Sequence, residues 1–158
     1  LVQDNTCVSC HSQADAMGQL QIPFGQLELV NTPSIDEPDH LTSYRELLFN
    51  DNELTIMNGA LIDVMVPVTD ANGNPVYEVD ADGNLILDAN GDPIPVMQGV
   101  NVQASMSSNA AATSQRFFQL FRTGGTHEGW LSSAELKLIS EWLDIGGQYY
   151  NNPFDVPQ

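Results

Sequence analysis

Apolar residues recur at the spacing of an amphipathic helix near the carboxyl end of the chain, between residues 133 and 145. Ser132 and Glu135 form the Ser-x-x-Glu pattern of a capping box directly before this stretch. Gly146 and Gly147 follow it, and glycine often occupies the position just after a helix. The pattern predicts a helix over residues 133–145 with a wide apolar face. That face comprises Leu136, Leu138, Ile139, Trp142, Leu143 and Ile145.

Shorter helices are predicted in three other places. Residues 108–122 have apolar side chains at helical spacing and stop before a Gly-Gly pair. Residues 43–50 begin with Ser43 and Glu46, which match a second capping box. A short helix is also expected within residues 1–20. The spacing of apolar residues over 53–66 hints at a helix, but the glycine inside that stretch weakens the prediction.

Residues 67–98 follow a different pattern, in which short apolar stretches alternate with Asp/Asn/Gly turns. Three related pentapeptides begin at Asp70, Asp80 and Asp88, and each has glycine at its fourth position. Asn-Gly and Asp-Gly favour hairpin turns, because such turns need positive φ. The pattern predicts a β-hairpin or β-meander arm inserted between helices.

The same turns offer carboxylate and amide oxygens, which are the ligands that calcium prefers. The candidate calcium ligands are Asp70, Asn72, Asp80, Asp82, Asp88 and Asn90. None of the turns matches a complete EF-hand loop, because the bidentate glutamate at the twelfth position is missing. Plain hairpin turns with solvated acids are the favoured alternative.

The net charge of the chain limits the kinds of macromolecule that it is expected to bind. The chain of 158 residues has 21 acidic and 4 basic side chains, which gives a formal net charge of -17. Nucleic acids and anionic lipid surfaces attract basic patches, so neither is an expected partner. A basic protein partner is compatible with this charge. The longest apolar runs are too short for a transmembrane segment.

The only two cysteines stand in the sequence Cys7-Val8-Ser9-Cys10-His11, which is the attachment motif of c-type haem. Side chains three positions apart lie on one face of a helical turn, so both thiols can reach one edge of a porphyrin. His11 then becomes the proximal iron ligand. A thioredoxin-like pair is disfavoured because no βαβ pattern surrounds the motif, and a zinc site because no second ligand pair follows. The motif also predicts a periplasmic or extracellular location.

The chain resembles small class I-like monohaem cytochrome c domains, and more closely those of large bacterial secreted proteins and of the hydrazine synthase alpha subunit. The resemblance is based on residues 7–11 and on residues 124–147, and it covers roughly residues 1–66 and 99–153. It implies a mainly α, cytochrome c-like helical domain around one haem. We therefore expect a cytochrome domain over 1–66 and 99–153, a β insertion over 67–98 and a tail over 154–158.

In the related domains a methionine after a Gly-Gly pair is the distal iron ligand, and here His127 holds the corresponding place. The resemblance therefore implies ligation by His11 and His127. Met106, in a Ser-flanked loop, is the main alternative, and His40 is another candidate. Met17, Met57, Met65 and Met97 are expected to fill the core.

Two protein ligands on the iron predict electron transfer rather than catalysis, since no open iron site remains. The expected partners are redox proteins, copies of the same domain or other domains of a larger chain. A peroxidase-like or hydrazine-synthase-like haem site is the enzymatic alternative. A calcium-stabilised assembly module that carries a haem is the structural alternative.

Overall fold

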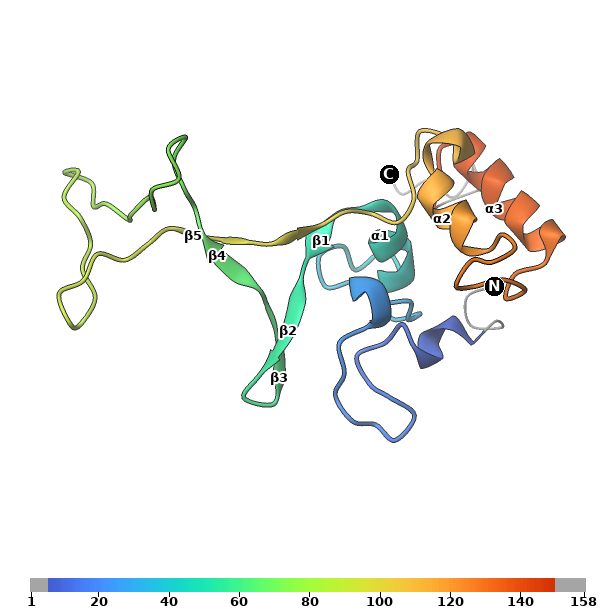
Figure 1. The fold of residues 1–158 in the computed structure, drawn as a ribbon, viewed down its shortest axis with the longest axis horizontal. Helices are drawn as coiled ribbons and strands as arrows, with labels where there is room; N and C mark the ends of the chain where they lie inside the picture. Colours follow the sequence, from blue (N-terminus) through green and yellow to red (C-terminus); the bar gives the residue numbers. More distant parts are fainter. Residues whose placement is uncertain (1–5, 150–158) are drawn as a thin grey trace. The chain divides into compact units, whose positions relative to one another are not determined.

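The computed structural model describes residues 6–149, which divide into two compact units. The first unit contains the chain up to Asp51 and again from Val102 onward, and the second contains Asn52–Asn101 (Figure 1). The predicted β insertion over residues 67–98 falls within the second unit. The predicted tail over residues 154–158 lies outside the described residues.

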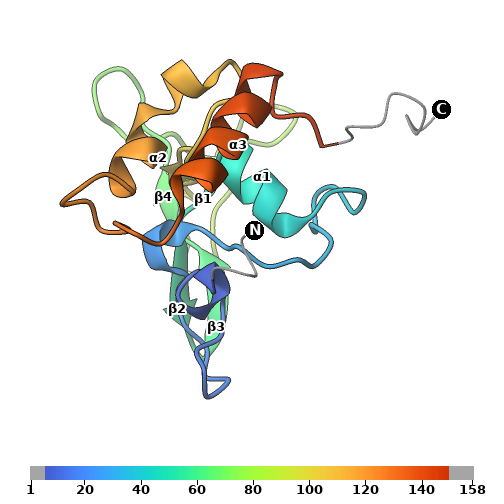
Figure 2. The same ribbon diagram turned by 90° about the vertical axis from the view of Figure 1, so that its right-hand side faces the viewer.

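The first unit has three short α-helices, α1 (Thr42–Leu48), α2 (Gln115–Leu120) and α3 (Ser133–Asp144). Helices α2 and α3 lie side by side in every view of this unit (Figures 1 and 2). Three single 3₁₀ turns complete its regular structure, and most of the remaining chain is irregular. These turns are η1 (Cys7–Ser9), η2 (Phe24–Gln26) and η3 (Ala111–Thr113).

Helix α3 confirms the strongest helical prediction. The Ser132 side chain accepts a hydrogen bond from the Glu135 backbone N–H, and the Glu135 side chain accepts one from the Ser132 backbone N–H. This reciprocal pair satisfies two donors that a helix start leaves without partners. Leu143 on this helix is fully buried, and with Leu29 and Met106 it forms the small apolar core of the described residues.

The predicted capping box of α1 is wrong. The N-cap of α1 is Leu41, which makes no side-chain capping hydrogen bond. The Glu46 carboxylate instead accepts a hydrogen bond from the backbone N–H of Glu28 at 3.1 Å. The described part of residues 1–20 forms a single 3₁₀ turn in place of the predicted helix, and the helix predicted over 108–122 is shorter than expected, with α2 following a 3₁₀ turn.

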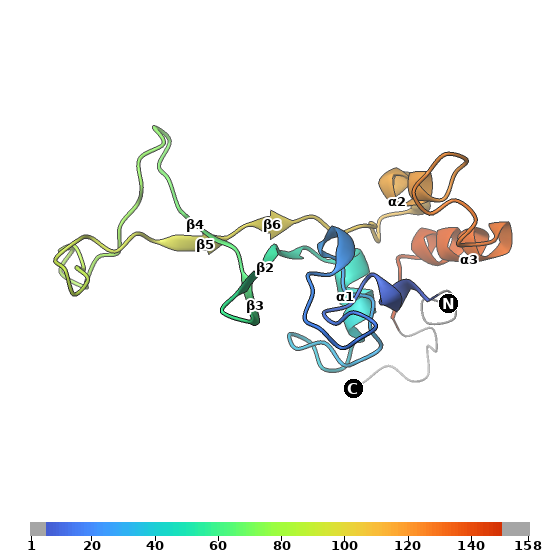
Figure 3. The same cartoon turned by 60° about the horizontal axis from the view of Figure 1, so that its bottom comes forward.

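Paired strands form most of the regular structure of the second unit (Figure 3). Strand β2 (Leu54–Met57) pairs antiparallel with β3 (Ala60–Asp63), so the helix hinted at over 53–66 is wrong. Asn58 and Gly59 both have positive φ at the hairpin tip, as a two-residue Asn-Gly turn requires. Strand β4 (Met65–Pro67) pairs with β5 (Met97–Gly99). The two-residue strands β1 (Asp51–Asn52) and β6 (Asn101–Val102) also pair.

Three-way junctions of the backbone join the hairpins of the second unit. At each junction three residues form a closed ring, in which every backbone N–H donates to the carbonyl of the next member at 2.7 to 3.0 Å. We call these the three-residue rings. They are formed by Glu53, Val64 and Val100, by Val68, Val76 and Val96, and by Glu78, Ile86 and Ile94. The hairpins therefore branch from one another, and the alternative of a simple meander is wrong.

The expected mainly α fold is wrong as a whole. Residues 6–149 contain three short α-helices, and several small antiparallel strand pairs accompany them. That expectation came from the family resemblance, and the apolar spacing over 53–66 added a helix to it although none of residues 52–101 is buried. Within residues 6–149, every helix is too short or too polar to cross a membrane.

Candidate functional site

A single turn of chain holds both cysteines and the first histidine. The backbone N–H of His11 donates to the carbonyl of Cys7 at 3.0 Å, and the N–H of Cys10 donates to the same carbonyl at 3.3 Å. The Ser9 hydroxyl donates to the carbonyl of Thr6 at 2.8 Å, at the start of the turn. The turn therefore has the helical spacing that the motif predicts, although it does not continue into a longer helix.

The ring of His11 is oriented by the backbone. Its Nδ1 lies 3.2 Å from the carbonyl oxygen of Leu27, which only accepts, so Nδ1 carries the proton. This arrangement leaves Nε2 unprotonated in the neutral ring. A histidine that binds a metal through one nitrogen commonly donates the other N–H to a carbonyl in this way.

His127 lies in a tightly folded loop between α2 and α3. Its backbone N–H donates to the carbonyl of Leu120 at 2.8 Å, and Gly124, with a φ of 81°, donates to the Glu128 carboxylate at 2.7 Å. A Cβ at Gly125 would collide with the Leu120 carbonyl, so the close approach of these segments requires glycine there. The Nδ1 of His127 lies 2.9 Å from the Thr126 hydroxyl. Its Nε2 is then the ring nitrogen left for a ligand.

The two histidines, 116 positions apart in the sequence, meet in space. Their ring centroids are 6.0 Å apart, and the ring planes differ by 29°. A metal–imidazole bond is about 2 Å long, so two imidazoles on opposite sides of one metal have bonded nitrogens about 4 Å apart and ring centres farther apart. Ordinary ring pairs also occur at such distances. The hydrogen bonds of the two Nδ1 atoms add to this distance, because both leave Nε2 as the ring nitrogen without that contact, and the Leu27 carbonyl also fixes the tautomer of His11.

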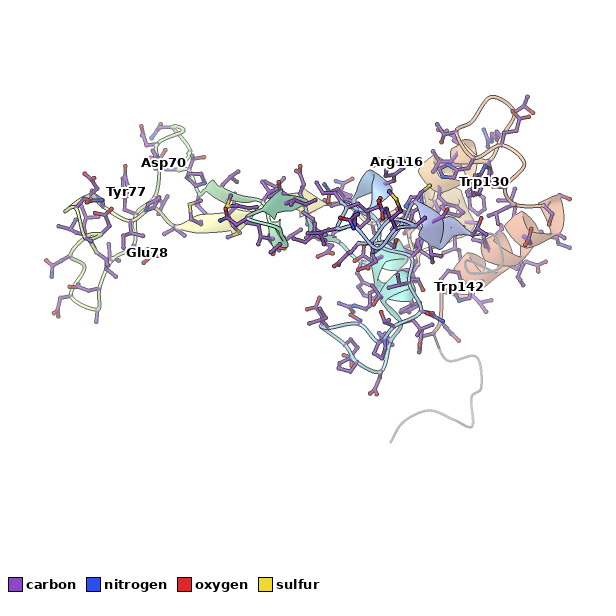
Figure 4. The ribbon with its side chains drawn as sticks, turned by 90° about the horizontal axis from the view of Figure 1, so that it is seen from below. Asp70, Tyr77, Glu78, Arg116, Trp130 and Trp142 are labelled. Carbon is purple, nitrogen blue, oxygen red and sulfur yellow. The ribbon has the colours of Figure 1, made fainter. Side chains whose placement is uncertain are left out.

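Large apolar side chains next to this histidine pair are open to solvent. Phe24, whose N–H donates to the Cys10 carbonyl, is 61% exposed, and Trp130, whose ring lies 6.2 Å from that of His127, is 45% exposed. Leu120, which accepts the His127 N–H, is also exposed. Trp130 stands on the loop between α2 and α3 (Figure 4). Exposed apolar side chains around two imidazoles and two thiols fit the apolar faces of a porphyrin.

Burial affects the ionisation of this site. It lowers the pKa of His11, and the neighbouring His127 lowers it further. The neutral imidazole that results is the form that binds metals. Burial also raises the pKa of the Cys7 thiol. Neither cysteine is in a disulfide.

The two alternative iron ligands have other surroundings. Met106 is 5% exposed, and its backbone N–H donates to the carbonyl of Leu47 at 2.8 Å. The His40 ring lies 5.0 Å from that of Tyr44 and 4.6 Å from that of Tyr149. Met106 thus belongs to the core and His40 to an aromatic cluster, whereas His127 is the histidine whose ring faces that of His11. Exposure of Met17, Met57, Met65 and Met97 contradicts their expected role in the core.

A half-buried carboxyl near the site was missed in the sequence. Glu46 accepts from the N–H of Glu28, and Glu28 shares one peptide group with the Leu27 carbonyl that contacts His11. Burial and the nearby Asp51 and Glu28 carboxyls raise the pKa of Glu46 to about 8. The local sequence signal favoured a cap, and only the tertiary structure places Glu46 beside Glu28.

The Asp/Gly turns are closed by their own side chains. In each turn the first aspartate accepts hydrogen bonds through Oδ1 from the second and fourth following N–H groups, at 2.8 to 2.9 Å. The side chains of Asp70, Tyr77 and Glu78 mark this region in Figure 4. Among residues 6–149, the structure gathers no group of three His, Cys, Asp or Glu side chains suited to a metal ion. Calcium binding by these turns stays the alternative to the favoured interpretation as plain hairpin turns.

A fourth turn of the same kind lies in the first unit and was missed in the sequence. Asp15 accepts from the N–H groups of Met17 and Gln19 at 2.8 Å, and Gly18 has a φ of 75°. The pattern Asp-Ala-x-Gly-x was the available signal. Met17 lacks a side-chain oxygen, so this turn forms without the amide or carboxylate that the other three have at that position.

Comparison of the chain with protein-family models, with curated proteins and with solved structures gave no match.

Proposed function

We propose that this chain is an electron-transfer domain that holds one haem c through Cys7 and Cys10, with His11 and His127 as the iron ligands. The observation that carries the proposal is the pair of facing imidazoles, 6.0 Å apart between centroids, each with its Nδ1 engaged. Bound haem would supply a one-electron couple, whose potential two imidazole ligands keep lower than a methionine ligand would.

The protein groups have separate roles in this proposal. The Leu27 carbonyl and the Thr126 hydroxyl orient the two imidazoles. The two thiols bond the cofactor to the turn, and the exposed apolar side chains of Phe24, Leu120 and Trp130 cover it. With His11 and His127 as its iron ligands, a bound haem would have no position open to a substrate and would exchange electrons with partner proteins. We propose a periplasmic or extracellular location and redox protein partners, with the net charge of -17 favouring basic ones.

The experiment is expression in a host that matures c-type cytochromes, followed by mass measurement and optical spectroscopy. We expect a mass increased by one haem and a low-spin spectrum. His127→Ala should abolish the low-spin spectrum, while Met106→Ala and His40→Gln should keep it. The opposite result, with loss of the signal in Met106→Ala alone, would reassign the distal ligand. A colourless polypeptide without the mass increase would refute the proposal.

Carbon monoxide distinguishes electron transfer from catalysis. The reduced protein is expected to bind it slowly or not at all, because His127 must first leave the iron. Rapid binding by the unaltered protein would show an open position and would favour a haem enzyme. His127→Ala is the matched positive control, since it should bind carbon monoxide readily.

A further inference from the structure

The peptide group between Leu27 and Glu28 makes hydrogen bonds on both of its sides. Its carbonyl oxygen lies 3.2 Å from His11 Nδ1, and its N–H donates to Glu46 Oε2 at 3.1 Å. In a trans peptide the C=O and N–H point in opposite directions, so one rigid group contacts the imidazole on one side and the carboxyl on the other. Hydrogen bonds in such a chain polarise one another.

The charge on Glu46 therefore acts on His11 through this peptide group. An ionised carboxylate polarises the N–H of Glu28 and makes the Leu27 carbonyl a stronger acceptor. A stronger bond to Nδ1 makes the imidazole a more basic ligand, which favours the more positive state of a bound metal. Protonation of Glu46 weakens the same chain and favours the more negative state.

We propose that Glu46 is a positioning residue that couples electron uptake at the His11 site to proton uptake from solvent. The inference rests on the proposed function. When a one-electron donor protein reduces the centre, Glu46 takes one proton from solvent onto its carboxylate, and on oxidation it returns that proton. One electron and up to one proton move together, and no covalent bond of the chain other than the carboxyl O–H changes.

The surroundings of Glu46 raise its pKa to about 8, so it changes its charge at a pH where the coupling can be measured. The Asp51 carboxyl hydrogen-bonds it, and together with Glu28 and burial it raises the pKa of Glu46 to about 8. Arg45 and Asp36 line one adjoining cavity with Asp51. The other adjoining cavity is lined by Glu46 and Asp51 together with uncharged residues, among them Leu27, Phe49, Val102, Gln103 and Ser105.

The test is the midpoint potential of the haem-loaded protein measured between pH 6 and pH 10. We expect it to fall as pH rises through the titration of Glu46. A threefold difference in the proton affinity of Glu46 between the two redox states corresponds to about 28 mV, at 59 mV for each factor of ten. In Glu46→Gln the midpoint potential should no longer fall as pH rises. Glu37→Gln removes an exposed carboxylate of the same unit and should keep the fall.

A second variant and a second readout make the test independent of how well Glu46→Gln folds. Asp51→Asn removes a hydrogen bond and a charge that raise the pKa of Glu46, so the fall should move to lower pH. The redox-induced infrared difference spectrum should contain a protonated carboxyl band near pH 8 that Glu46→Gln lacks. A potential independent of pH, or an unchanged fall in Glu46→Gln, would overturn the coupling and leave the haem assignment intact. A chain without haem would overturn both.

Discussion

The two units of this chain are stabilised by different kinds of interaction. In the first unit, side chains from distant parts of the sequence are buried (Leu29, Met106 and Leu143), and the rings of His11 and His127 lie near each other in the site. In the second unit, no side chain of residues 52–101 is buried, and the three-residue rings and hairpin turns hold the backbone. Side-chain packing thus defines the first unit, and backbone hydrogen bonding defines the second.

This difference assigns separate roles to the units. A site that needs two imidazoles at a fixed separation requires tertiary contacts, and only the first unit has a core. The second unit gains little hydrophobic stabilisation, since each hairpin is closed by its own turn and joined through backbone groups. Substitutions should therefore have long-range effects in the first unit and local effects in the second.

The largest expected effect is the loss of the central core side chain. Leu143→Ala should lower the free energy of unfolding of the first unit by about 2 to 5 kcal/mol, because Leu143 is fully buried and the change leaves a cavity. Urea unfolding monitored through the tryptophans measures it, since Trp130 and Trp142 both lie in this unit. Leu138→Ala, at an exposed position of the same helix, is the control and should cost far less. Equal losses would mean that α3 has no buried face.

A smaller and local effect is expected from opening a three-residue ring. Ile86→Pro removes the N–H that donates to the Glu78 carbonyl at 3.0 Å, and a net backbone hydrogen bond contributes about 1 kcal/mol. Hydrogen exchange at the Glu78 and Ile94 amides should accelerate about fivefold or more, while the first unit stays unaffected. Ile86→Val keeps the N–H and should leave exchange unchanged. Faster exchange in the first unit would contradict the local effect expected for this substitution.

The same difference explains how far the sequence predicts the fold. Helix α3 was predictable because its cap and apolar face are local signals within a dozen residues. The β2–β3 hairpin also had a local signal, Asn58-Gly59, but the apolar spacing around it resembled a helix. The three-residue rings had no local signal, since each joins residues from three separate stretches whose side chains are not distinctive.

The candidate site shows the same limit. Residues 7–11 could be identified because covalent haem attachment requires a fixed short spacing. The pairing of His127 with His11 was expected mainly from a family resemblance, and the local sequence supported it only through the Gly-flanked loop before a capped helix, which His40 lacks. Glu46 was assigned to a helix cap by its spacing from Ser43, whereas the folded chain brings it to the Glu28 amide. The supporting groups of a site depend on tertiary contacts that spacing does not encode.

Acid should loosen the turns of the second unit. Hydrogen bonds from backbone N–H groups lower the pKa values of Asp70, Asp80 and Asp88 below their usual 3.8. Their stabilising contribution is therefore present above pH 3.8 and is lost as pH falls through the lowered folded pKa. Amide chemical shifts of Asn74 and Asn84 should change in that acidic window. Asp80→Asn should remove the change at Asn84 and keep it at Asn74, and a change that survives at Asn84 would contradict this explanation.

Calcium is expected to have the smallest effect. The Asp15 turn is the internal control for the three turns of the second unit. That turn makes the same Oδ1 hydrogen bonds as the other three although Met17 has no side-chain oxygen. Since the turn closes without that oxygen, we expect chelator and added calcium to leave the amide shifts of all four turns unchanged. Calcium binding would instead shift the turns that begin at Asp70, Asp80 and Asp88 and spare the one at Asp15. Amide shifts confined to those three turns would show that the second unit binds calcium. Backbone hydrogen bonds alone would then no longer explain how this unit is stabilised.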